Sequence, residues 1–180
     1  DATCQRCGDF VRFDTIPAKG HHGIADAFGM CPDCGLYIIA PFFIHTANEA
    51  DSLGLNSSYV NYYAIENAAQ LYWFVKLVNG GSTNVNAVLT ADIVVNEDVL
   101  TAEGNLNGNG SNFKLWEPIG NNSFNIVTGT YNKYTGTFDG NSHTISGLYF
   151  YNTSTNNVGL FGNTNGATIK NVGVVDSYFN

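Results

Sequence analysis

The feature that most constrains the fold is an internal repeat near the end of the chain. Residues 144–150 (TISGLYF) align with residues 168–174 (TIKNVGV), position by position. Gly147 aligns with Asn171, and glycine and asparagine adopt the left-handed backbone conformation most readily. A sharp bend once per coil would stack the aligned apolar residues into one core. These aligned apolar pairs are Ile145 with Ile169, Leu148 with Val172, and Phe150 with Val174. The repeat predicts a parallel β-helix.

A second arrangement of the same strands is also compatible with the sequence. Short strands and frequent turns also suit a sandwich of ordinary β-hairpins. We favour the solenoid because its apolar positions recur in step.

Composition favours a turn-rich β protein and excludes several classes of partner. Hydrophobic residues make up 44% of the 180 residues, whereas charged residues make up only 12%, about half the usual share. The net charge of −8 would repel phosphate backbones, which argues against nucleic acid as a partner. The chain has no apolar run long enough for a membrane span and no targeting segment at its start.

The last residues predict an open end to the solenoid. Residues 172–179 have the pattern of a strand, and no capping element follows before Asn180. An open coil exposes strand edges and apolar core. We therefore expect either further coils in a longer parent protein or self-association, with copies stacked end to end as a filament.

All four cysteines lie in the first quarter of the chain, in two C-x-x-C-G turns. Such turns point two thiolates at one centre, and two of them complete a tetrahedral set. Strand-like segments follow each turn, at residues 10–16 and 36–44, as in a zinc ribbon. The predicted ligands of a structural zinc ion are Cys4, Cys7, Cys31 and Cys34.

Other interpretations of the cysteine module carry less weight. Two disulfides would suit a secreted protein, but a vicinal C-x-x-C turn is a strained place for a disulfide. A catalytic zinc ion would need an open coordination position, which four thiolates do not leave. His21, His22 and His45 are more often loop residues than alternative ligands.

The middle of the chain predicts a linker and then a single helix. Residues 47–61 are polar and rich in turn formers, which is typical of a linker. Apolar residues then recur at helical spacing from Ile65 to Leu77, with Asn67 as the N-cap and a stop at residues 79–81. We expect this helix to cap the first coil, with Tyr72, Trp73 and Phe74 as capping contacts. Strands are expected at residues 87–95, 113–119 and 134–138.

Five segments within residues 62–180 are distinctive in combination: 134–149 (YTGTFDGNSHTISGLY), 116–120 (WEPIG), 67–71 (NAAQL), 89–93 (LTADI) and 158–162 (VGLFG). Together they resemble bacterial cell-surface β-helix proteins of the GLUG-repeat type. The resemblance implies an extracellular, multidomain bacterial protein with adhesin-like coils, and it transfers no catalytic residue. Only the first GLUG-like coil is present.

The carboxylates do not form an obvious catalytic pair. A β-helix lyase commonly needs a basic residue and calcium-binding carboxylates, but both arginines lie in the cysteine module. A glycosidase needs two facing carboxyl groups, and neighbouring strand residues such as Glu97 and Asp98 point to opposite faces. Asp139 is better explained as a turn former, and no nucleophile elbow surrounds Ser142 and His143.

These inferences combine into one prediction for the whole chain. We expect a mainly β protein with a zinc-ribbon-like module at residues 1–46, a linker at 47–61, and a capping helix plus the opening coils of a right-handed parallel β-helix at 62–180. The expected function is a non-catalytic structural or adhesive module of an extracellular or cell-surface protein, with itself, a glycan or a surface protein as partner. The alternative is a non-catalytic region of a secreted polysaccharide-degrading enzyme or peptidase.

Overall fold

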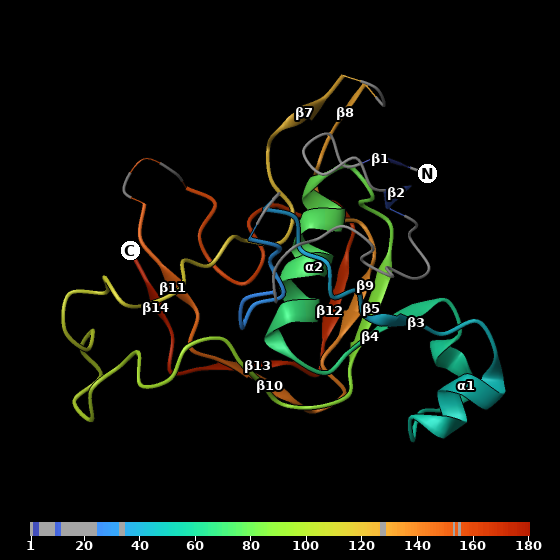
Figure 1. The fold of residues 1–180 in the computed structure, drawn as a ribbon, viewed down its shortest axis with the longest axis horizontal. Coiled ribbons are helices and arrows are strands. Elements are labelled where there is room, and N and C mark those ends of the chain that lie inside the picture. Colours follow the sequence, from blue (N-terminus) through green and yellow to red (C-terminus); the bar gives the residue numbers. More distant parts are fainter. Residues whose placement is uncertain are drawn as a thin grey trace.

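A computed structural model describes residues 2–3, 10–11, 25–32, 35–126, 129–152, 154 and 156–180 of the chain. Within these residues the protein is mainly β, with few helices, as predicted (Figure 1). The strands are β1 (Ala2–Thr3), β2 (Phe10–Val11), β3 (Phe42–Phe43), β4 (Tyr62–Ile65), β5 (Asn86–Leu89), β6 (Ile93–Val94), β7 (Phe124–Asn125), β8 (Thr130–Tyr131), β9 (Thr137–Asp139), β10 (Thr144–Ser146), β11 (Tyr149–Phe150), β12 (Thr168–Lys170), β13 (Gly173–Val175) and β14 (Tyr178–Phe179).

The largest sheet has five strands in the order β12-β9-β5-β4-β3. Its first four strands are parallel, and β3 pairs with β4 in the antiparallel sense. Strand β3 belongs to the segment that was predicted to form a zinc ribbon. That segment and the body of the protein therefore share one hydrogen-bonded sheet.

Two further ladders of parallel strands accompany this sheet. One has the order β13-β10-β6, and the other pairs β11 with β14. Single parallel bridges join Leu115 to Tyr149, Ile119 to Phe161, and Tyr134 to Thr164. Within these parallel ladders and bridges, the chain therefore runs in the same direction at each return.

The predicted stacking of residues 144–150 on residues 168–174 is wrong. Ile145 lies opposite Val174 and not opposite Ile169, whose own ladder partner is Phe138. The two similar segments begin with β10 and β12, which belong to different ladders. They resemble each other because each is a short strand followed by a left-handed corner residue, and not because they stack.

The corners explain why several expected strands are broken in two. Gly147 and Asn171 both have positive φ, as predicted, with values of 74° and 54°. The segment 172–179 bends at Asp176, whose φ is 43°, and so forms β13 and β14. The segment 87–95 is also divided, into β5 and β6, but without a residue of positive φ between them. The expected strand at 113–119 is reduced to single bridges at Leu115 and Ile119.

The predicted helix is present as α2 (Ala68–Asn79). The Asn67 side chain accepts a hydrogen bond from the Gln70 amide at 3.0 Å, and Gly81 follows the helix with φ of 116°. The helix connects the parallel strands β4 and β5, and it lies against the large sheet in Figure 1. The prediction missed β4, which occupies the residues before the helix.

The segment expected to be a linker contains regular structure. It forms α1 (Ala47–Ser52) and the 3₁₀ turn η1 (Ser57–Tyr59). Thr46 and Glu49 form a reciprocal capping box at the start of α1. Polar residues dominate this segment, but Ala50 and Leu55 are buried with Ile44 and Val88 in a small apolar cluster.

One continuous apolar core lies between α2 and the ladders. The helix contributes Leu71, Phe74, Val75 and Val78, all with no exposed surface. The ladders contribute the buried residues Leu89, Ile93, Phe138, Ile145 and Leu148. No helix in the described part of the chain is long and apolar enough to cross a membrane.

Candidate functional site

Cys31 lies at the start of a tight hairpin. The Cys31 amide donates to the Leu36 carbonyl and the Gly35 amide donates to the Cys31 carbonyl, both at 2.8 Å. Gly35 has φ of 70°, and an antiparallel bridge joins Met30 to Tyr37. The Cys31 residue is completely buried. This backbone is compatible with the predicted metal-binding turn, because it brings Gly35 and Leu36 within hydrogen-bonding distance of Cys31.

The other predicted ligands Cys4, Cys7 and Cys34 lie outside the described residues, as do His21 and His22. Within the residues that the structure describes, no three histidine, cysteine or acidic side chains gather into a group that could hold a metal ion. The ring of His45 packs edge-on against Phe43, with 4.9 Å between the ring centroids. The zinc site remains a prediction.

Aromatic rings attach the Cys31 hairpin to helix α2. Tyr37 stacks on Tyr72 with 5.3 Å between centroids and an interplanar angle of 6°, and Phe28 meets the same ring edge-on at 5.6 Å. The backbone approaches closely at Gly29, where an added Cβ would lie 2.9 Å from the Cβ of Ala69. Burial raises the pKa of Tyr37 to about 12. The hairpin is therefore packed firmly on the helix.

Lys114 completes this aromatic contact. Its Nζ atom lies 4.9 Å from the centroid of the Phe28 ring and 5.6 Å from the centroids of Tyr37 and Tyr72. A cation in this position is attracted to the negative faces of the rings. This cluster was not predictable from the sequence, because residues 28, 37, 72 and 114 share no local spacing.

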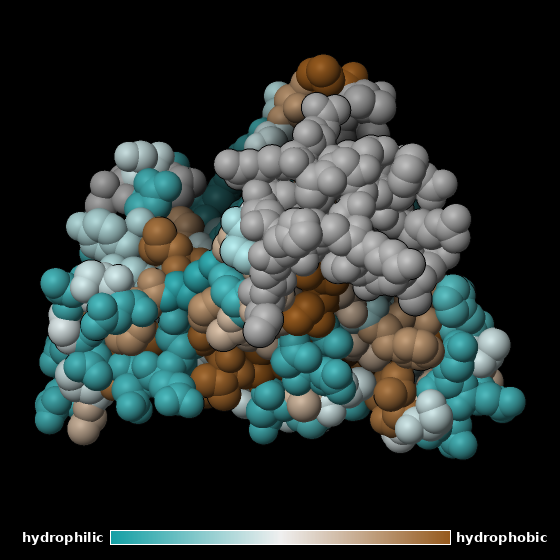
Figure 2. All heavy atoms as spheres, viewed as in Figure 1, coloured by the Kyte–Doolittle hydropathy of each residue, from teal (hydrophilic) through white to brown (hydrophobic). Residues whose placement is uncertain are grey.

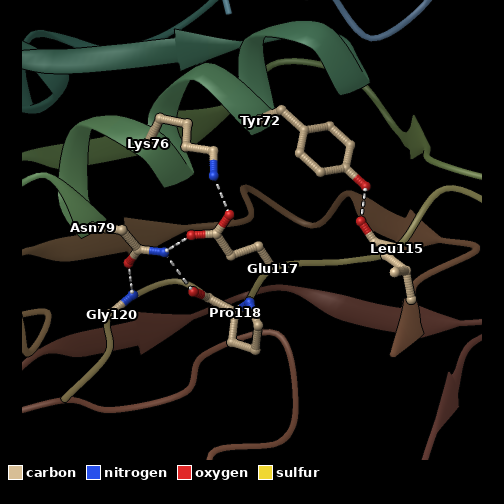
Figure 3. A network of polar contacts seen from close by, with 7 residues as sticks. All are labelled: Tyr72, Lys76, Asn79, Leu115, Glu117, Pro118 and Gly120. Atoms are coloured by element: carbon tan, nitrogen blue, oxygen red, sulfur yellow. Dashed lines mark hydrogen bonds and ion pairs between the residues drawn. The ribbon is translucent and has the colours of Figure 1, made fainter. Parts of the chain in front are cut away.

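A polar network holds the other end of α2 to residues 115–120 (Figure 3). The Asn79 side-chain amide donates to Glu117 Oε1 at 2.8 Å and to the Pro118 carbonyl at 3.1 Å, and its oxygen accepts from the Gly120 amide at 2.8 Å. Lys76 forms an ion pair with Glu117. The Tyr72 hydroxyl donates to the Leu115 carbonyl at 3.0 Å. These contacts join α2 to residues 115–120, and both the nitrogen and the oxygen of the Asn79 side chain are hydrogen-bonded.

Asp139 is the most buried carboxylate of the described residues, with 1% of its side chain exposed. It accepts hydrogen bonds from the Asn141 amide at 2.9 Å, the Tyr59 hydroxyl at 2.8 Å and the Asn171 side chain at 3.0 Å. Lys170 Nζ lies 3.1 Å away. Burial alone would raise the pKa of Asp139, but these hydrogen bonds hold it below its ordinary value. The predicted role as a turn former is confirmed by the bond to Asn141.

Other carboxylates of the ladder region also contact the backbone or a basic group. Asp176 accepts from the Val99 and Leu100 amides at 3.1 Å and 2.7 Å. Asp92 accepts from the Thr144 amide at 2.7 Å and lies 3.4 Å from the His143 ring. Each therefore has a structural partner that accounts for its position.

The outermost strands of the two larger ladders leave apolar surface uncovered. The exposed fractions are 42% for Ile169 on β12, 41% for Val174 and 47% for Val175 on β13. Phe138 and Ile145, the ladder partners of Ile169 and Val174, have no exposed surface. Ladder partners such as these stack into columns of apolar side chains. The columns continue to this outer row of strands, β12 and β13, where the last side chains are exposed.

A second exposed apolar feature is the hairpin formed by β7 and β8. It projects from the body of the protein, and Figure 2 shows apolar side chains at its outer end. Ile126 is 87% exposed, and the rings of Phe124 and Tyr131 are about half exposed and in contact, with 5.3 Å between centroids. A cleft lined in part by Tyr131 lies beside this hairpin. These residues were not predictable as a surface feature from the sequence, because polar segments surround them.

Comparisons with protein-family models, curated proteins and solved structures find no match for this chain.

Proposed function

We propose that the chain is a non-catalytic structural or adhesive module of an extracellular or cell-surface protein, built on the opening coils of a right-handed parallel β-helix. The observation that carries the proposal is the set of parallel ladders whose apolar columns run from a buried interior to an uncovered outer row. Ladders of this kind extend by adding one coil after another. The right hand follows the rule for parallel crossover connections.

In this proposal α2 is the cap of the solenoid. Its buried aromatic residues contact residues of the ladders, with Phe74 meeting Tyr134 and Phe138 at 6.1 Å between ring centroids. A terminal cap is what a solenoid needs to keep water from the end of its core. The helix α2 then covers one end of the core, and the outer row of strands at the other end stays open to a partner molecule.

The cysteine module would be a zinc ribbon that stabilises the capped end. A structural zinc ion held by Cys4, Cys7, Cys31 and Cys34 would supply the folding energy that so small a module lacks. The stacking of Tyr37 on Tyr72 supports this assignment of role, because it connects the Cys31 hairpin to the cap.

We propose a second copy of the chain as the partner of the uncovered outer row, which would give a homo-oligomer or a filament through this open end. Strands β12 and β13 stand at the edges of their ladders, where backbone groups face outward beside exposed apolar side chains. Such edges pair readily with other strands. The low share of charged residues, 12%, leaves little repulsion at this surface.

Light scattering over a series of protein concentrations tests this function. We expect the mass of wild type to rise with concentration and the double variant Ile169→Lys, Val174→Lys to stay monomeric. The control is Ile126→Lys, which places the same charge on the projecting hairpin and should leave association intact. A wild-type chain that stays monomeric at high concentration would contradict self-assembly.

A further inference from the structure

The cleft beside the projecting hairpin has the size of a ligand site. Its volume is about 420 Å³, within the range usual for small-molecule sites. It is formed by the α2–β5 connection, the hairpin, the segment that follows the hairpin and the next coil. The lining residues are Thr83, Gly129, Tyr131, Lys133, Thr135 and Asn165.

Three of these residues come from one short segment of the chain. Tyr131, Lys133 and Thr135 all line the cleft, and the Lys133 amide donates to the Tyr131 carbonyl at 2.8 Å, so the chain turns at Asn132. Tyr131 is 53% exposed, and Phe124 supports its ring from the neighbouring strand. Thr135 donates to the Thr83 carbonyl at 3.1 Å, which joins the two walls of the cleft.

The charge of the cleft is opposite to that of the chain. The chain has a net charge of −8, yet Lys133 is the one charged residue among the described residues that line the cleft. Its Nζ atom lies 5.8 Å from the centroid of the Tyr131 ring, so a single ligand would contact both the cation and the ring. A ligand that carries a carboxylate therefore finds its counter-ion here and meets repulsion over most of the remaining surface.

We propose that this cleft binds an acidic carbohydrate, a saccharide whose sugar units carry carboxylates. The C–H face of a sugar ring would pack on the negative face of the Tyr131 ring. A carboxylate would pair with Lys133, and sugar hydroxyls would bond with the hydroxyl of Thr135 and the amide of Asn165.

This inference rests on the proposed adhesive function and names its ligand class. An acidic peptide shares the carboxylates, but it lacks the sugar ring face that an exposed Tyr131 accepts. Nucleic acid would need several cations, and a single lysine does not provide them.

Titration of the full 180-residue chain with tetragalacturonate, monitored by NMR or calorimetry, tests the proposal. We expect saturable binding that weakens at least tenfold in Tyr131→Ala and persists in Tyr151→Ala, which removes an equally exposed tyrosine outside the cleft lining. Lys133→Met should abolish the preference for tetragalacturonate over a neutral galactose tetramer. Rising salt should weaken wild-type binding.

Three results would overturn the proposal: no binding to tetragalacturonate, an equal loss in Tyr131→Ala and Tyr151→Ala, or equal affinity for polyglutamate. Light scattering of Tyr131→Ala distinguishes failure of the cleft assignment from failure of the proposed function. The variant should assemble like wild type, since Tyr131 lies outside the outer row of strands. Saccharide binding by a chain that never self-associates would leave the cleft assignment standing and remove only the assembly.

Discussion

Val174 lies directly opposite Ile145 in parallel register, yet Ile145 has no exposed surface and Val174 is 41% exposed. The two side chains belong to one column of stacked apolar residues, in which Ile145 is buried and its neighbour Val174 is exposed. We predict that Ile145→Ala lowers the free energy of unfolding by about 3 kcal/mol, because it leaves a cavity in the core. Val174→Ala should cost less than about 1 kcal/mol. Urea unfolding of dilute samples compares the two, and equal costs would argue against an open column.

Asn79 and Lys76 offer a second contrast, one turn apart on α2. Asn79→Ala removes three hydrogen bonds, including the acceptor of the Gly120 amide, and we expect a loss of about 2 kcal/mol. Lys76→Ala removes an ion pair between half-exposed side chains and should cost no more than about 1 kcal/mol. Thermal denaturation distinguishes the two variants. A larger loss in Lys76→Ala would contradict this ranking.

The stability of the protein should fall in acid, with Asp139 as a main cause. Its pKa is lowered in the folded state, so the unfolded chain binds the proton more tightly. The contribution of Asp139 is therefore complete above the ordinary carboxyl pKa of about 3.9 and is lost as the pH falls through the lower folded value. We expect Asp139→Asn to cost about 2 kcal/mol at pH 7.

Denaturant unfolding of wild type and Asp139→Asn from pH 7 to pH 2 checks this pH dependence. The difference between the two proteins should narrow as the pH decreases below about 4. Glu103→Gln serves as the control, since Glu103 is an exposed carboxylate. A difference that stays constant over the whole pH range would exclude Asp139 as the titrating group.

Gly147 combines a left-handed backbone with a close approach of the chain. A Cβ at this position would lie 1.8 Å from the Asn96 carbonyl oxygen, and φ is 74°. Gly147→Ala should therefore cost more than about 3 kcal/mol, from strain and overpacking together. Gly104 has φ of 79° but open space around it, so Gly104→Ala should cost only about 1 kcal/mol. Similar melting temperatures for the two variants would mean that this corner is not tightly packed.

Metal content tests the cysteine module. Native mass spectrometry with metal analysis should find one zinc ion per chain, and Cys31→Ser should lose it, because three thiolates hold zinc more weakly than four. His45→Ala is the control and should keep the metal. Chelation should lower the melting temperature of wild type. A metal-free chain with a mass deficit that corresponds to two disulfides would replace the zinc ribbon by a disulfide-bonded module.

Local sequence signals predicted part of this structure well. The helix α2 was predictable because Asn67 and Gly81 mark its ends and its apolar residues follow helical spacing. The left-handed corners at Gly147 and Asn171 were predictable from residue type alone. The turn at Asp139 was predictable because an aspartate before glycine bonds its own backbone.

Contacts between distant residues were not predictable from one sequence. The repeat register failed because corner signals recur in different ladders, so β10 and β12 look alike although β10 pairs with β13. Strand β4 was missed because its residues run into the helical pattern. The cleft unites residues as far apart as Thr83 and Asn165, and no local pattern connects them.

The register of the ladders is the central claim, and methyl NOE spectroscopy tests it most directly. In a sample labelled on isoleucine and valine methyl groups, we predict a contact between Ile145 and Val174. A contact between Ile145 and Ile169 instead, with none to Val174, would restore the register predicted from the sequence repeat and contradict the stacked ladders on which the proposed function depends.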